Sequence, residues 1–96
     1  MKGKQRAFLR GLANSIDAKY QIGKNGIDGS VLTQLEEALE ANELIKVNVL
    51  ENCPLSSREC CDEVCEKINA EPVQVIGKKF VIYKESKNNK QIEIPK

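Results

Sequence analysis

Two glycines three positions apart, Gly23 and Gly26, enclose Lys24 and Asn25 in a segment suited to holding a phosphate group. The segment lies between a strand-like run ending at Ile22 and an expected helix. The first N–H groups of a helix lack partners and carry partial positive charge, so such a junction favours an anion. Without glycine side chains in the way, a phosphodiester could approach the main chain. Taken alone, however, this pattern is more commonly a plain turn.

Three basic residues, Lys4, Arg6 and Arg10, lie within two turns of an expected first helix that carries no acid. Their mutual repulsion is uncompensated unless a polyanion supplies the counter-charge, although exposed basic residues are often simply solvated. We treat these three as candidate phosphate contacts, and we add Lys19 from the strand that follows.

The formal net charge of +1 conceals an uneven distribution. Residues 1–26 carry six basic groups and one acid, residues 27–72 carry three and eleven, and residues 73–96 carry six and two. If the fold brings the two ends of the chain to one side, the molecule acquires a positive face and a negative face.

Four cysteines, Cys53, Cys60, Cys61 and Cys65, are numerous enough for a zinc site. Their spacing is poor for zinc, because structural sites usually use pairs two to four residues apart on turns, and the chain has no histidine. A free buried cysteine behaves as a small hydrophobic residue. We expect the cysteines to pack in the core, with a metal site or a redox switch as the alternatives, and we expect no cofactor.

Enzymatic chemistry has little support. There is no histidine for acid–base work, no phosphate-binding P-loop, and no serine or cysteine with an evident base. We therefore expect a protein that is not an enzyme and takes no small-molecule substrate. The acids between Glu36 and Glu71 fit a solvated helix face, or alternatively a surface for docking another protein.

Hydrophobic periodicity predicts seven elements. They are helices at 4–13, 28–42 and 56–69 and strands at 18–22, 44–50, 73–76 and 80–83, with Asp28 or Ser30 as N-cap and Asn42 as left-handed stop of the second helix. In the second strand Ile45, Val47 and Val49 alternate with Lys46 and Asn48, which indicates burial on one side.

The last two strands are joined by Gly77 and Lys78, a pair suited to a two-residue hairpin turn. Lys78 and Lys79 are weaker candidate contacts, because lysines are common at hairpin tips. The element order, α-β-α-β-α-β-β, predicts an α/β sandwich with a mixed four-stranded sheet packed by helices.

Length and composition are those of one ordinary globular domain, with 41% hydrophobic and 30% charged residues. We assign the domain to residues 1–86 and a short polar and basic tail to residues 87–96. No apolar run approaches the length of a membrane span, and no signal peptide is evident, so we expect a cytoplasmic protein without membrane contact.

Four segments in order resemble the signatures of the CRM domain, named for chloroplast RNA splicing and ribosome maturation. These segments are Phe8–Ala13, Ile22–Ile27, Leu39–Glu40 with Glu43–Val47, and Val73–Lys78. The resemblance is to the stand-alone bacterial, YhbY-like version and spans about residues 3–84. The chain departs from it in the cysteines of the third helix and in the lysine-containing tail.

The resemblance implies an RNA-binding fold similar to the C-terminal domain of a bacterial translation initiation factor, with a KH-like loop. It implies binding to ribosomal RNA in precursors of the large (50S) subunit and a role in ribosome assembly. Carried to this chain, it makes Gly23, Lys24, Asn25 and Gly26 the RNA contacts, assisted by the first helix. We expect a monomer.

All four aromatic residues, Phe8, Tyr20, Phe80 and Tyr83, occupy positions that fit the core. We therefore expect no aromatic platform for base stacking. Binding should depend on RNA backbone and shape, and should favour structured RNA over a short linear sequence.

Overall fold

A four-stranded mixed sheet with three helices forms the molecule, as seen in a computed structural model that describes residues 1–95. Lys96, the last residue of the expected tail, lies outside the described residues. In chain order the elements are α1 (Gly3–Ala13), β1 (Ala18–Ile22), α2 (Gly29–Asn42), β2 (Leu44–Val49), α3 (Ser57–Ile68), β3 (Glu71–Ile76) and β4 (Lys79–Tyr83). The α/β architecture and the element order predicted from the sequence are confirmed.

The strands follow the order β1-β2-β4-β3 across the sheet. β1 and β2 are parallel, with Ile22 opposite Val49, whereas β4 runs antiparallel to both β2 and β3. The hairpin between β3 and β4 turns at Gly77, whose φ of +55° matches the expected two-residue turn.

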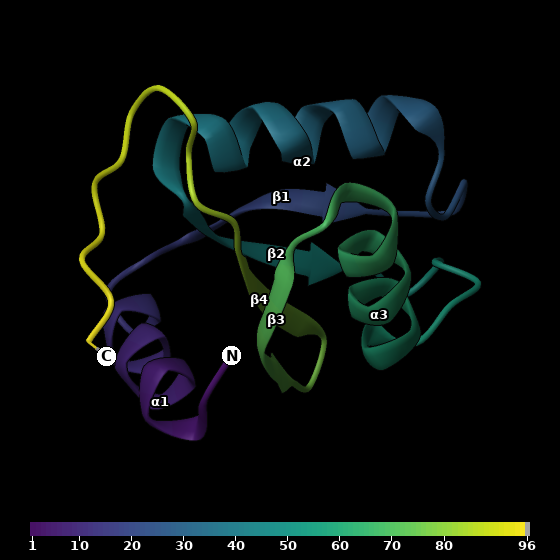
Figure 1. Ribbon diagram of the computed structural model, residues 1–96. Coiled ribbons are helices and arrows are strands. Elements are labelled where there is room, and N and C mark those ends of the chain that lie inside the picture. The colour runs from purple at the N-terminus through teal and green to yellow at the C-terminus, as the bar shows by residue number, and fades with distance from the viewer. Residues whose placement is uncertain (96) are drawn as a thin grey trace.

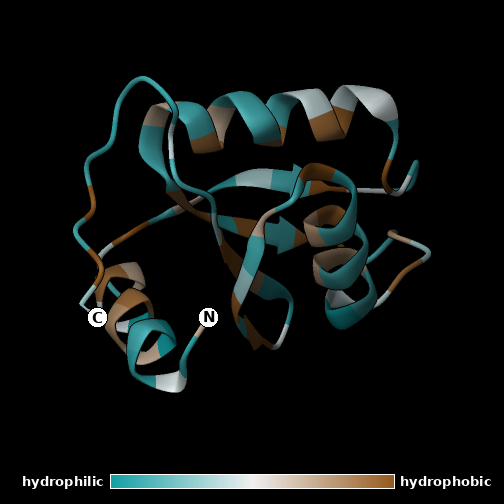
Figure 2. Ribbon diagram, viewed as in Figure 1, coloured by the Kyte–Doolittle hydropathy of each residue, from teal (hydrophilic) through white to brown (hydrophobic). Residues whose placement is uncertain are grey.

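Helices cover both faces of this sheet (Figure 1), with α2 and α3 on one face and α1 on the other. The larger core lies under α2 and α3 and includes Phe80, Ile82 and Val47, all fully buried. The smaller core joins Leu9 and Ala13 of α1 to the opposite sheet face. Figure 2 shows the matching pattern in α2, whose hydrophobic residues lie on the side toward the sheet.

The end of α2 differs from the prediction. Asn42 is the last helical residue, and the left-handed stop is Glu43, with a φ of +66°. This conformation is unfavourable for a residue with a side chain. This cost is offset by the main-chain hydrogen bonds that the buried Glu43 carboxylate accepts, which are described below.

The two ends of the described chain meet beside α1. Figure 1 places the N and C marks there, and the Gln5 side-chain amide donates to the Pro95 carbonyl at 3.1 Å. Ile92 and Ile94 pack against the smaller core. The two termini thus lie on the α1 side of the sheet. Lys84 and Lys87, which follow β4, lie instead beside the acids of α2, where Lys84 Nζ is 4.0 Å from Glu36 Oε2. A positive face on the α1 side therefore does not include all of the C-terminal lysines.

Candidate functional site

The Gly23–Gly26 segment forms a tight turn at the end of β1. The Gly26 N–H donates to the Gly23 carbonyl at 2.9 Å, and Gly26 has a φ of +63°, which strongly favours glycine. Lys24 and Asn25 are exposed at the tip. Their main-chain N–H groups take part in none of the hydrogen bonds found within residues 1–95, so both are available to an incoming acceptor.

The connection between β2 and α3 supports this turn from behind. The Leu50 N–H donates to the Ile22 carbonyl at 2.9 Å. A Cβ added at Gly23 would lie 3.5 Å from Leu50 Cδ1, an ordinary contact, and one at Gly26 would lie 3.6 Å from Pro54 Cγ. The turn is therefore packed on one side and open on the other.

The N-terminus of α2 is less available to an anion than the sequence pattern suggested. Asp28 is the N-cap, and its carboxylate accepts from the Val31 N–H at 2.8 Å. This carboxylate already satisfies one of the free N–H groups and offsets the helix dipole. The groups left to meet an anion at this loop are Lys24 and the N–H groups of the turn itself.

The tip of the β3–β4 hairpin lies at the same end of the sheet as the loop. The Val49 N–H donates to the Lys78 carbonyl at 2.7 Å, and Val49 pairs with Ile22 at the start of the loop. The Lys78 ammonium lies 3.8 Å from the Glu51 carboxylate, with both side chains well exposed. Such an exposed pair is weak and leaves Lys78 able to exchange partners.

The basic residues of α1 lie toward the other end of the sheet. α1 packs over Leu44, which begins β2, whereas the loop adjoins the residue where β2 ends. Lys4 and Arg10 are exposed, but Arg6 is half-buried and its Nε donates to the Pro72 carbonyl at 3.0 Å. The structure therefore does not join α1 and the loop directly, and the uncovered part of the sheet lies between them.

Lys19 is exposed on β1 and lines a cleft of about 510 Å³ with Asp17 and Lys46. Lys46 and Lys79 lie on the sheet face between α1 and the loop. Sequence reasoning missed Lys46 as a candidate contact and ranked Lys79 low. The sequence pattern could have identified Lys46, because its alternation with Ile45 and Val47 places it on the less buried face of the strand.

One aromatic residue differs from the prediction. Phe80 and Tyr83 are buried and Tyr20 is half-buried, but Phe8 is exposed, as is Leu12 one helical turn later. Leu9 and Ala13 are the α1 side chains that are buried against the sheet, and Phe8 and Leu12 lie beside this row on the helix surface.

Three of the cysteines, Cys60, Cys61 and Cys65, are buried in the larger core, which confirms the packing prediction for them. Cys53 is half-buried, with its Sγ 3.8 Å from Cys60 Sγ. Burial and this neighbouring thiol raise the pKa of Cys60 to about 12. Within residues 1–95, no three Cys, Asp or Glu side chains are arranged to hold a metal ion.

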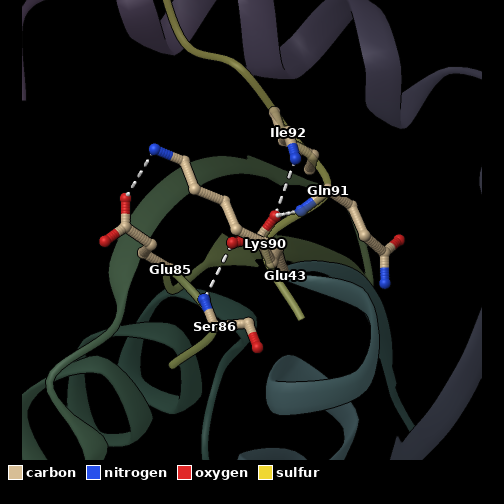
Figure 3. Close-up of polar contacts among 6 residues, drawn as sticks. All are labelled: Glu43, Glu85, Ser86, Lys90, Gln91 and Ile92. Carbon is tan, nitrogen blue, oxygen red and sulfur yellow. Dashed lines mark hydrogen bonds and ion pairs between the residues drawn. The ribbon is translucent and has the colours of Figure 1, made fainter. Parts of the chain in front are cut away.

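Two carboxylates of the acidic middle bind the C-terminal segment. Glu43 accepts main-chain hydrogen bonds from Ser86 at 2.8 Å, Gln91 at 2.6 Å and Ile92 at 2.7 Å (Figure 3). Glu40 accepts from the Ser86 hydroxyl and from main-chain groups of the two residues that follow. These two acids are thus engaged inside the molecule and are not simply a solvated face.

The hydrogen bonds also affect ionisation. Burial disfavours the charged form of Glu43, but its N–H donors outweigh burial and hold the pKa of Glu43 below its ordinary value of 4.5. The pKa of Glu40 is lowered as well, chiefly by the Ser86 hydroxyl and then by the main-chain donors. Both groups therefore favour the folded chain when ionised.

The fold and the glycine-flanked loop define the class of protein. The chain matches the CRS1/YhbY (CRM) domain model over residues 1–84, and it belongs to that family. Its relatives include YqeI of Bacillus subtilis, named a probable RNA-binding protein, which is 44% identical over 99% of each chain. A Haemophilus influenzae protein named RNA-binding protein is 34% identical over 97% of this chain and 93% of its own.

A solved structure shares the fold as well as the sequence. The solution structure of a hypothetical protein from Staphylococcus aureus superposes with a TM-score of 0.82 at 47% identity, covering 99% of both chains. In the part of the present chain that the structure describes, no helix has the length and apolar character needed to cross a membrane.

Proposed function

We propose that this protein binds RNA, with the Gly23–Gly26 loop holding the phosphate backbone. The observation that carries the proposal is the geometry of that turn, where two unpaired main-chain N–H groups and the exposed Lys24 are presented together. The names of the relatives as RNA-binding proteins support the same function. Loops of this type in KH domains clamp about four nucleotides.

We further propose ribosomal RNA in precursors of the large subunit as the target, with the protein acting as a monomer during assembly. Support comes from the CRM resemblance, in which this association accompanies the loop. The opposite charges of two helices also fit a polyanion partner, because α1 carries lysine and arginine without an acid while α2 carries acids alone.

The proposal is tested by measuring affinity for large-subunit rRNA fragments across a salt series. Lys24→Glu should weaken binding by about tenfold, because one phosphate contact is replaced by repulsion. Lys67→Glu is the matched control, since it makes the same change of charge on α3, where Lys67 faces Glu63 at 3.6 Å. Equal affinities of Lys24→Glu and wild type, with both folded, would contradict the loop assignment.

A second candidate function is an adaptor that docks a protein on the acidic helices while holding RNA. Glu37 on α2 and Glu66 on α3 are exposed and form no ion pair within residues 1–95. Reversing both charges should then abolish cosedimentation with ribosomal particles and leave RNA affinity intact. Loss of both activities together, or of neither, would count against a separate docking surface.

A further inference from the structure

α1 covers only part of its face of the sheet, and the uncovered remainder forms two rows of side chains. Strand pairing places Lys46, Val81 and Gln74 in the first row and Asn48, Lys79 and Ile76 in the second. The second row lies nearer the hairpin tip and the Gly23–Gly26 loop.

A hollow of about 230 Å³ lies over these rows, bordered by Asn14 at the end of α1. Val81, only 4% exposed, forms its floor, and Ile76, 61% exposed, is the most exposed large hydrophobic residue of the described chain. An apolar floor with an apolar side wall suits a flat ring better than a fully hydrated ion.

The surroundings of the hollow are positive. Lys46 and Lys79 line it, neither takes part in an ion pair within residues 1–95, and no acid is among the lining residues. The side-chain amides of Asn14 and Gln74 are likewise absent from the hydrogen bonds found there. Each amide offers a donor and an acceptor, the groups that read the edge of a base.

The volume of the hollow and its distance from the Gly23–Gly26 loop limit which chemical group could occupy it. At about 230 Å³ the hollow is smaller than typical small-molecule sites of about 300–1,000 Å³, which limits an occupant to a group no larger than about one base. Gln21 pairs with Asn48 in the second row, and Gly23 follows two residues later, about 7 Å along the strand. Two strand spacings separate β1 from β4, which adds roughly 10 Å across the sheet. A segment of about four nucleotides on the loop can span that separation.

We propose that this hollow accepts a single unpaired base of the RNA whose backbone the Gly23–Gly26 loop holds. The inference rests on the proposed function. Lys46 and Lys79 contact the flanking phosphates, the Gln74 and Asn14 amides bond the base edge, and Ile76 packs on the ring. The protein then distinguishes RNA with unpaired nucleotides from a continuous duplex.

The test uses two uncharged changes, so that a loss of general electrostatic attraction cannot explain the result. Gln74→Ala and Ile76→Ser should each weaken binding to a hairpin RNA with a single-stranded loop, on the order of tenfold. Binding to a fully paired duplex with the same stem should not change. Gln34→Ala, an exposed amide on α2, is the matched control and should bind both RNAs as wild type does.

A second measurement does not depend on the variants. The hairpin carrying 4-thiouridine in its loop is crosslinked to the wild-type chain, and we expect the crosslinked peptides to include residues 74–81. Crosslinks confined to other surfaces would overturn the proposal, as would unchanged hairpin affinity in both variants. If Lys24→Glu weakens binding while Gln74→Ala and Ile76→Ser do not, the hollow alone is refuted. If wild type binds neither RNA, the proposed function fails with it.

Discussion

The two glycines of the loop serve different physical purposes. Gly26 holds a left-handed φ of +63°, whereas the Gly23 Cβ position meets only ordinary contacts. Gly26→Ala should therefore lower the free energy of unfolding by about 1–2 kcal/mol. Gly26→Asn should lose less, because asparagine tolerates this conformation, and Gly23→Ala should lose least. Denaturant unfolding checks the order, and an equal loss in all three variants would contradict it.

Glu43 is a residue whose role the sequence could not reveal. Its partners lie 43 to 49 positions further along the chain and are main-chain N–H groups, which leave no trace in side-chain patterns. Phe8 shows a similar limit, because helical periodicity marks a hydrophobic side without showing how wide a row the sheet covers. The turn at Gly23–Gly26 could be predicted because its geometry depends on neighbouring residues alone, whereas its contact with RNA stays a prediction.

Replacing Glu43 by Gln should lower the free energy of unfolding by about 1.5–3 kcal/mol, since hydrogen bonds to a charged acceptor are lost. Glu37→Gln on the same helix is the control, and its exposed side chain should change stability by less than about 0.5 kcal/mol. Denaturant titration of both variants measures the difference. Similar stabilities for the two would show that the C-terminal segment contributes little.

The lowered pKa values of Glu40 and Glu43 predict how stability depends on pH. As the pH falls below 4.5, the unfolded chain takes up protons before these carboxylates do in the folded chain. The stabilisation they provide is therefore fully present above 4.5 and is lost as the pH falls through their folded values. Unfolding measured from neutral to acidic pH should show this loss, and a Glu40→Gln, Glu43→Gln variant should show a flatter curve. Parallel curves would contradict the assignment.

At the scale of elements, helices and strands were predictable to within one or two residues. Periods of 3.6 and 2 are imposed by burial against one sheet, and the caps are local, as with Ser56 and Glu59 at the start of α3. The stop of α2 was misplaced by one residue because it depends on Glu43 and its distant partners. What could not be predicted was how far along the sheet α1 extends.

Asp28 caps the N-terminus of α2 and places a negative charge two residues after Gly26, so it affects both the stability of the helix and the charge beside the loop. Asparagine caps a helix about as well as aspartate, so Asp28→Asn should preserve the fold while removing a negative charge beside the loop. RNA affinity should rise by about twofold to fivefold at low salt. Asp28→Ala should instead lower the free energy of unfolding by about 1 kcal/mol. Unchanged or weaker RNA binding by a folded Asp28→Asn would show that phosphate does not approach this helix end.

The whole molecule separates its charges across the sheet. α1 carries basic residues without acids, and α2 carries acids without basic residues, so a near-zero net charge hides two oppositely charged helices. Figure 1 shows these helices on opposite sides of the strands. Charge counts along the chain indicated basic ends and an acidic middle, because each helix is a contiguous segment. Opposite faces were expected only if the fold brought the two ends together. The counts could not predict that the loop and the α1 residues would be separated by an open sheet face.

The central claim, that the Gly23–Gly26 loop holds an RNA backbone, is tested most directly by the salt dependence of binding. Affinity for a hairpin RNA is measured over a series of salt concentrations for wild type and Lys24→Glu. The logarithm of the association constant should fall linearly with the logarithm of salt concentration, and the slope should be smaller by about 1 in the variant. Identical slopes and affinities, with both proteins folded, would contradict the account.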